Sequence, residues 1–450
     1  MTSGRALGLF LCSIPLLHGQ AEMTLHETVD RAIGNYPSVR VSTEQLQAAS
    51  AAITLARTAY LPRADFLAQA NRATRNNVFG LLLPQSTLPA ISGPPNPTNS
   101  LTSVWGSAVG LLVSWEPFDF GLRQANLDAA EAARRRADAS VERTKFDVAV
   151  AAADAYLTAL AAEQTFKAAQ AQLERTRTID KIVAALADAE LRPGADVSRT
   201  RAEIAAAEVQ IEQAQNAIDV TRTTLRQLTG AEIRPLAGGL LQLPPQIPID
   251  ENVQDSPYAR EQAAAVAEIQ AQRRALDRAY YPRFNLQGAS YARGTGANPD
   301  GTTEGGVSGL GPNIHNWALG MTVTFPIFDL PSIRARKDIV EHRRLAEAAR
   351  YDQILVDLQA QVRQARERLQ TARRVADLLP RQLEAARAAE LQATARYRAG
   401  LGTLIEVADA QRLLTQTEID DSLARLNVWR SILSVAAAGG DLAPFLNQVK

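Results

Sequence analysis

Cysteine is almost absent from this sequence of 450 residues, in which Cys12 is the one thiol. A single cysteine cannot form an internal disulfide or a thiolate metal site, so neither organises the fold. Histidine is also rare, and the four residues are scattered, with no His-Glu-x-x-His motif for zinc: His18, His26, His315 and His342. The sequence therefore predicts no metal site, no cofactor and no catalytic residue, and hence a protein that is not an enzyme.

An excess of one charge sign is also missing, since 48 Lys and Arg residues balance 48 Asp and Glu residues. Nucleic-acid-binding domains usually carry a net basic surface, so we expect no nucleic-acid partner. Aromatic residues make up only 5%, which is low for a large globular core. Ala, Gln, Arg and Glu dominate long stretches instead, a composition typical of long helices that pack closely.

Long apolar runs are absent beyond residue 22, where no segment reaches the roughly 18 consecutive apolar residues of a membrane-spanning helix. Residues 1–21 differ, because Arg5 precedes the apolar segment 6–17 and small residues follow at 19–21. This pattern predicts a signal peptide over 1–21 and therefore export. A buried N-terminal helix is the alternative. Leu11 is too bulky for the residue that precedes a lipid-modified cysteine.

What the sequence does contain is an internal repeat. Residues 113–119 (VSWEPFD) align with 323–329 (VTFPIFD) at an offset of 210 residues, and the same offset pairs Gly230 with Gly440. Upstream, residues 59–63 (AYLPR) match 279–283 (AYYPR) at an offset of 220 residues, so one loop is longer in the first copy.

The repeat divides the chain into successive segments. We predict a first structural repeat over 22–230, a Pro- and Leu-rich connector over 231–257, a second repeat over 258–440 and a tail over 441–450.

Each copy begins with a helix that ends at the Tyr-x-Pro-Arg element, because proline disfavours helical geometry in the preceding residue. A strand, a Gly/Pro/Asn-rich loop and a second strand follow. Alternation with a period of two places five large side chains on one face of the last strand: Trp317, Leu319, Met321, Val323 and Phe325. Asp119 and Asp329 then mark the start of helix, where we interpret them as N-caps and not as catalytic acids.

Helical pattern then continues to about Glu190 and to about Arg398, roughly 70 residues or 105 Å in each copy. Heptad spacing indicates coiled-coil packing, for example at Ile204, Ile211, Ile218 and Leu225. Short turns containing Pro or Gly break each long helix, after which a second helix returns antiparallel.

Four strands cannot close a barrel, and an open sheet in lipid would leave two edges unpaired. The chain must therefore oligomerise: a dimer supplies eight strands and a trimer twelve. Small barrels of about eight strands are filled by side chains, so the small residues on one strand face favour the trimer with its lumen. The other face would meet lipid, with candidate aromatic girdles at Trp105, Trp115, Trp317 and Phe325.

The order of these features resembles the TolC-like outer-membrane efflux proteins. The resemblance covers nearly the whole mature chain and includes the paired repeat, the Tyr-x-Pro-Arg strand entry and residues 225–230 (LRQLTG). It implies a mainly helical fold with membrane β-structure: a homotrimeric 12-stranded outer-membrane β-barrel, four strands per chain, continued into the periplasm by a long α-helical coiled-coil barrel. The resemblance also implies a passive duct that docks onto an inner-membrane pump through a periplasmic adaptor protein.

The resemblance implies that the helix–helix turns form the periplasmic tip that adaptors contact. The matching residues are Leu191, Arg192, Pro193 and Gly194 in the first turn, and Arg398, Ala399, Gly400, Leu401, Gly402 and Thr403 in the second. The alternative is a plain turn that needs Pro and Gly for chain reversal.

The family's tip narrows to a gate, and four residues here match its positions: Asp196, Tyr397, Glu406 and Asp409. Glu406 and Asp409 lie three residues apart on one helix face, so a trimer would place six carboxylates around the lumen. Alternatively, the two acids only complement the helix N-terminal dipole. Gly402 departs from the family, in which a basic residue bridges neighbouring helices.

The residues alone are compatible with two other classes of protein. A periplasmic coiled-coil adaptor or scaffold without a barrel is the main alternative, although adaptors typically carry one hairpin and not two equal copies. An exported enzyme is the third, and it lacks a convergent polar constellation. The transported substrate cannot be read from the sequence.

Overall fold

The computed structural model describes residues 22–83, 85–88, 93–190, 194–231, 236–244, 252–325 and 327–449. The predicted signal peptide and the tip residues Leu191, Arg192 and Pro193 lie outside the described residues.

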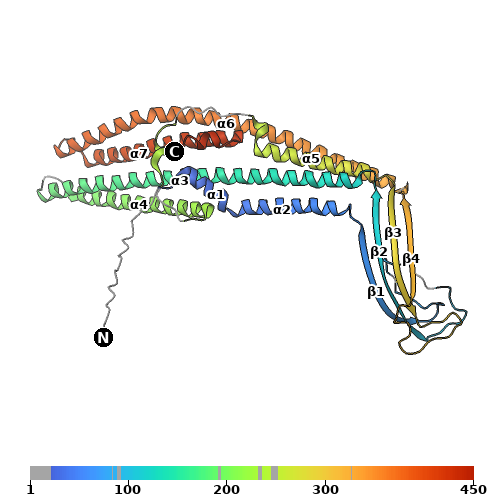
Figure 1. The fold of residues 1–450 in the computed structure, drawn as a ribbon. Coiled ribbons are helices and arrows are strands. Elements are labelled where there is room, and N and C mark those ends of the chain that lie inside the picture. The colour runs from blue at the N-terminus through green and yellow to red at the C-terminus, as the bar shows by residue number, and fades with distance from the viewer. Residues whose placement is uncertain are drawn as a thin grey trace, which may run out of the picture. The chain divides into compact units, whose positions relative to one another are not determined.

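The order of elements repeats in the two halves of the chain (Figure 1). The first half contains α1 (Leu25–Asn35), α2 (Pro37–Thr58), β1 (Arg63–Thr74), β2 (Ser103–Phe118), α3 (Leu122–Asp188) and α4 (Gly194–Thr229). The second contains α5 (Pro257–Arg278), β3 (Arg283–Thr295), β4 (Ile314–Thr324), α6 (Leu330–Arg398) and α7 (Leu404–Gly439). Short helices are η1 (Gly238–Leu241), η2 (Val253–Asp255), η3 (Ile327–Asp329) and α8 (Ala443–Leu446). The predicted alternation of helix, strand pair and helical hairpin is confirmed.

The chain packs as two compact units, and each takes segments from both halves. The strand unit comprises Glu44–Asp138 and Gln262–Tyr351, and the helical unit comprises the rest of the described chain. The predicted segments 22–230, 231–257 and 258–440 follow the sequence repeat and not this packing, so they stay a prediction about repeats.

In the strand unit, the four strands form one antiparallel sheet in the order β1-β2-β3-β4. The register puts Phe66 opposite Leu111, Leu111 opposite Ser290 and Ser290 opposite Trp317, so these side chains share a face. We call it the apolar face; it also carries Val113, Leu286, Leu319, Met321 and Val323. The opposite, polar face carries Gln69, Asn71, Ala108, Gly110, Arg293 and Thr322.

The apolar face is strongly exposed at β4, where 81% of Trp317 and 71% of Leu319 are accessible. Large exposed side chains that lie side by side on an apolar face mark a surface that meets a partner or lipid. β1 and β4 each pair on one side only in the described sheet, so both edges are available for pairing.

Asp119 caps the start of α3 through its side chain, as predicted, although Gly121 and not Asp119 directly precedes the helix. Its carboxylate accepts hydrogen bonds from the Arg123 amide (2.6 Å) and the Gly121 amide (3.2 Å) at the start of α3. Burial alone would raise the pKa of this carboxyl, but the hydrogen bonds outweigh it and the pKa is lowered. At Asp329 the backbone carbonyl accepts instead, from the Ser332 hydroxyl (2.9 Å).

The core of the helical unit joins segments that are far apart in the sequence. Tyr156 of α3, Leu225 of α4 and Trp429 of α7 belong to one buried cluster. The connector contributes Leu236 and Leu240 to the same cluster, so this part of it packs beside the helices. None of the described helices combines the length and apolar character needed to cross a membrane.

Tyr156 anchors the connector through its hydroxyl, which donates to the Met23 carbonyl (2.9 Å) and accepts from the Ala237 amide (3.0 Å). Burial raises the pKa of Tyr156 to about 12. We expect Tyr156→Phe to lower the free energy of unfolding of the helical unit by about 1–3 kcal/mol near neutral pH, because it removes two hydrogen bonds that each contribute about 0.5–1.5 kcal/mol.

The difference in stability between wild type and Tyr156→Phe should also depend on pH. The folded-state pKa of Tyr156 is raised from 10.0 to about 12. Its contribution to stability is therefore complete below pH 10 and is lost as pH rises through 12. Thermal unfolding followed by circular dichroism should show the difference between wild type and Tyr156→Phe shrinking over that interval. A difference independent of pH would contradict this role.

Candidate functional site

A small buried cluster lies beside the second helix–helix turn in the helical unit. Ile179 and Val183 of α3 pack there with Leu404 and Val407 of α7, around the ring of Tyr397 from α6. Tyr397 is only 1% exposed, although it lies one residue from the end of its helix. A side chain of this size, buried so close to a turn, holds the two hairpins against each other.

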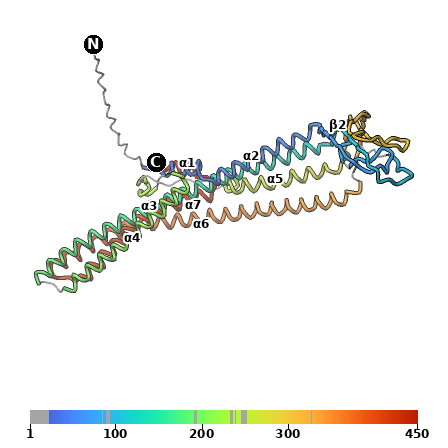
Figure 2. Tube along the Cα trace, turned by 90° about the horizontal axis from the view of Figure 1, so that it is seen from below, coloured from blue at the N-terminus to red at the C-terminus, as the bar shows by residue number. Residues whose placement is uncertain are grey.

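The hydroxyl of Tyr397 donates to the Asp196 carboxylate across 3.3 Å. Asp196 lies in the first turn of α4, where a carboxylate also complements the positive end of the helix dipole. Two of the four predicted gate residues are thus brought together from helices of different hairpins. Figure 2 shows the ends of α3, α4, α6 and α7 gathered at this part of the molecule.

The second turn has the geometry of a Schellman motif. The Leu401 amide donates to the Arg396 carbonyl (2.9 Å) and the Gly400 amide to the Tyr397 carbonyl (3.0 Å). Gly400 has a φ of 76°, a conformation that a side chain would strain. Arg398, Ala399 and Leu401 are exposed around it, as adaptor contact would require.

Gly402, which lacks the family's basic side chain, is buried. A Cβ atom there would lie 3.2 Å from the Arg396 Cβ and 3.3 Å from a Glu406 carboxylate oxygen. Such contacts are tight, so the neighbours would have to move to admit a side chain. The local packing at this turn is therefore adapted to glycine.

Thr403 is the N-cap of α7, and its hydroxyl oxygen accepts from the Glu406 amide (3.3 Å). The same hydroxyl lies 3.3 Å from the Glu406 carboxylate and donates to it. This Thr-x-x-Glu arrangement resembles a capping box, so Glu406 stabilises its own helix end. The cap leaves Glu406 exposed, and a role at a gate stays a prediction.

Asp409 is exposed one turn further along α7, and its charge acts on Arg412. Arg412 binds Glu203 of α4 at 2.5 Å; this hydrogen bond first, and the Asp409 charge in addition, raise the pKa of Arg412. The local charge near the predicted carboxylate pair is therefore mixed.

Sequence reasoning missed these cross-hairpin contacts. Arg175 of α3 donates to the Thr415 hydroxyl (2.8 Å) and to the Glu418 carboxylate (3.0 Å) of α7. Asp409 and Arg412 lie three residues apart on one helix, a spacing that predicts their interaction from the sequence. The pairing of Arg175 with residues about 240 positions away has no local signal.

The predicted girdle residues divide between the two ends of the strands. Trp105 and Trp317 lie near the strand ends that loops connect. Trp115 lies near the opposite end of β2, which leads into α3. Phe325 directly follows β4 at the same side. The Trp115 indole donates to the Tyr60 carbonyl (3.1 Å), so its polar edge is engaged.

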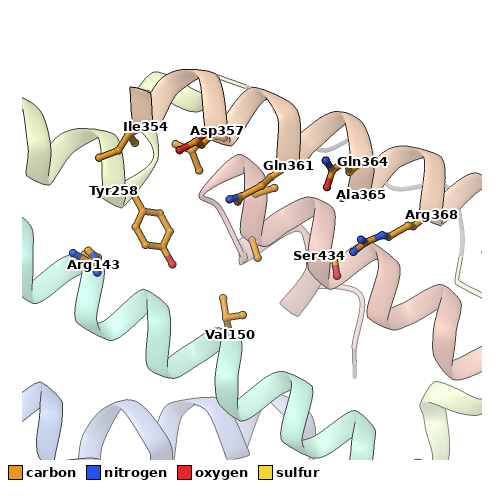
Figure 3. A pocket seen from close by; sticks show the side chains of 13 residues that line it. Arg143, Val150, Tyr258, Ile354, Asp357, Gln361, Gln364, Ala365, Arg368 and Ser434 are labelled. Atoms are coloured by element: carbon orange, nitrogen blue, oxygen red, sulfur yellow. The ribbon is translucent and has the colours of Figure 1, made fainter. Parts of the chain in front are cut away.

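A groove of about 580 Å³, lined by both polar and apolar side chains, lies between α3, the start of α5, α6 and α7 (Figure 3). Gln361 and Arg368 line the α6 wall, opposite Arg143 and Tyr258. Arg143 binds Glu261 (2.8 Å), and the Tyr258 hydroxyl donates to Asp147. Burial first, and then Asp147, raise the pKa of Tyr258 to about 12, so it stays neutral and acts as a donor. These engaged groups stabilise helix packing.

Among the described residues, no group of three or more His, Cys, Asp or Glu side chains is arranged to hold a metal ion.

Comparison with known proteins gives one family and one fold. The family model described as outer membrane efflux protein matches residues 28–231 and 249–441. Nodulation protein T of Rhizobium leguminosarum bv. trifolii is 25% identical over 428 residues, which cover 92% of this chain and 85% of that protein.

Two solved outer-membrane channels share the fold. The CmeC channel of Campylobacter jejuni superposes with a TM-score of 0.76 at 18% identity, covering 92% of this chain and 85% of that one. The open state of the Neisseria gonorrhoeae MtrE channel gives 0.72 at 20% identity, covering 93% and 89%. The predicted fold class is confirmed.

Proposed function

Because this chain belongs to the outer membrane efflux protein family and lies in the outer membrane with a periplasmic helical extension, we propose that it is the channel subunit of a tripartite efflux or secretion system. Three copies form a passive duct from the periplasm to the exterior. A periplasmic adaptor connects the duct to an inner-membrane pump, which supplies the energy.

One observation carries this proposal: a four-stranded sheet with two available edges and one exposed apolar face. Pairing β4 of one copy with β1 of the next removes both kinds of edge when three copies close a ring. Twelve strands leave a lumen, which the polar face would line, while the apolar face meets lipid. A water-soluble adaptor would have no use for an exposed Trp317 and Leu319, and the family match to both halves also disfavours that alternative.

The aromatic residues fit this orientation. Trp105 and Trp317 would form the outer girdle, and Trp115 and Phe325 the periplasmic one.

The turn region would close the periplasmic end. The Tyr397–Asp196 hydrogen bond supports a gate that holds the hairpins together, and Glu406 and Asp409 are exposed where a ring of carboxylates would favour cations. Arg398 to Thr403, together with Leu191 to Gly194, would form the surface that the adaptor contacts.

A test uses the fact that Cys12 is the only cysteine and lies in the predicted signal peptide. Leu401→Cys would place a single thiol at the tip, and Val356→Cys a control thiol on α6; both positions are exposed, 74% and 62%. Both proteins should form a trimer in the outer membrane, seen by electrophoresis of samples that are not heated. Only Leu401→Cys should form a crosslink to a purified periplasmic adaptor. Equal crosslinking at both positions would contradict tip docking, and failure to form a trimer would contradict the channel itself.

A further inference from the structure

The loop that joins β1 to β2 turns back onto the sheet. We call residues 75–102 the outer loop; its described parts are 75–83, 85–88 and 93–102. It lies where the strands end on the side away from α2 and α5 (Figure 1). Leu88 is 6% exposed and Ala108 on β2 is 4% exposed, because this described part of the loop covers the sheet.

The loop lies on the polar face, because the side chains that hold it all belong to that face. From β1, Asn71 donates to the Leu81 carbonyl (2.7 Å) and Gln69 to the Leu83 carbonyl (3.2 Å). From β3, Arg293 donates to the carbonyls of Phe79 (2.7 Å) and Gly80 (3.3 Å). The loop therefore crosses over β2, and anchors on both sides fix its backbone.

Gly110 of β2 makes room for this crossing. A Cβ atom there would lie 2.9 Å from the Leu88 Cδ2 and 2.5 Å from the Tyr291 Cβ of the neighbouring strand, whereas one at Gly106 would lie 3.6 Å from the Leu82 Cδ2, an ordinary contact. The loop thus seats Leu88 over a strand that has no side chain at Gly110. Glycine in a strand often marks such a close approach of another segment.

We infer that the outer loop is a lumenal constriction at the exterior end of the channel, with Arg293 as its positioning residue. This inference rests on the proposed trimer, in which the polar face lines the lumen. Three loops would then project Phe79, Leu81 and Leu83, which are 37%, 44% and 56% exposed, into the passage. Apolar side chains at a narrow point disfavour hydrated ions and admit amphipathic or apolar cargo.

The experiment measures access to the lumen from outside the cell. Thr322→Cys places a single thiol on the polar face of β4, near the helix end of the strand and beyond the outer loop. Intact cells are treated with a membrane-impermeant maleimide carrying a bulky polymer. We expect slow labelling with the wild-type loop, and labelling at least about tenfold faster when Asn71→Ala and Arg293→Gln remove two anchors, because each supplies a hydrogen bond that holds the loop.

Arg72→Gln is the matched control. Arg72 lies on β1 one residue from Asn71 but on the opposite face, where it contacts Ser103 (3.0 Å) and not the outer loop. The control should leave the labelling rate unchanged. Replacing residues 79–83 by glycine and serine gives a second variant that keeps both strands intact, in case the anchor substitutions impair folding.

The outcomes separate this inference from the proposed function. An outer-membrane trimer in which the bulky reagent labels Thr322→Cys equally fast with the wild-type and the altered loops would overturn the constriction and leave the channel. The absence of any trimer in the unaltered Thr322→Cys protein would overturn the proposed channel first.

Discussion

Leu319→Arg is expected to abolish assembly of the channel in the outer membrane. Leu319 lies in the middle of β4 on the apolar face and is 71% exposed. An arginine that faces lipid near the bilayer midplane costs about 2–4 kcal/mol in a transmembrane barrel. A homotrimer would bear that cost in each of its three copies. The measurement is the amount of heat-modifiable trimer in outer-membrane fractions, which should fall to background.

Thr322→Arg is the matched control, because the register puts Thr322 on the polar face of the same strand. An arginine there would project into the aqueous lumen, so we expect a normal amount of trimer. If Leu319→Arg assembled as well as Thr322→Arg, the apolar face would not be the lipid face. Failure of both would indicate that β4 tolerates no arginine and would require a milder pair of substitutions.

Tyr397→Ala is expected to make the periplasmic end leak. The substitution removes the central ring of a cluster formed by α3, α6 and α7, and truncation of a large buried aromatic side chain typically costs about 3–5 kcal/mol. Much of that loss would fall on the contact between the hairpins. Cells carrying the variant should become sensitive to large antibiotics that the outer membrane normally excludes, and the purified channel should show higher conductance.

Tyr397→Phe separates packing from hydrogen bonding. It keeps the ring in the cluster and removes the hydroxyl that donates to Asp196 across 3.3 Å. A typical hydrogen bond contributes about 0.5–1.5 kcal/mol net, so we expect an intermediate increase in conductance. Asp196→Asn should resemble Tyr397→Phe more than Tyr397→Ala. Normal conductance in Tyr397→Ala, with the trimer intact, would show that this cluster does not close the channel.

The position of Gly402 bears on how such a gate would work. A basic side chain at this turn bridges helices in the family that the sequence resembles, and glycine cannot do so. The buried Gly402 leaves space for Arg396 and Glu406, whose atoms would lie within 3.3 Å of a Cβ atom there. Closure in this chain would therefore depend on the Tyr397 cluster more than on a basic latch.

The sequence alone determined the features that depend on near neighbours. The strand faces followed from the alternation at Trp317, Leu319 and Met321, because successive side chains of a strand point to opposite sides. The helix starts followed from residues such as Asp119, because a cap acts within one turn. The repeat predicted the same order of helix, strand pair and helical hairpin in both halves, since two copies of one pattern are expected to fold alike.

The contacts between segments that are distant in the sequence became visible in the three-dimensional structure alone. Nothing near Tyr397 in the sequence indicates that it packs on Ile179 and Val183, which come from the other half of the chain. Likewise, Arg293 donates to the Phe79 carbonyl across 214 positions, and the Gly, Pro and Asn content of that loop gives no sign of the contact. Local periodicity specifies which face of an element is apolar, whereas the partner of that face depends on how the whole chain packs.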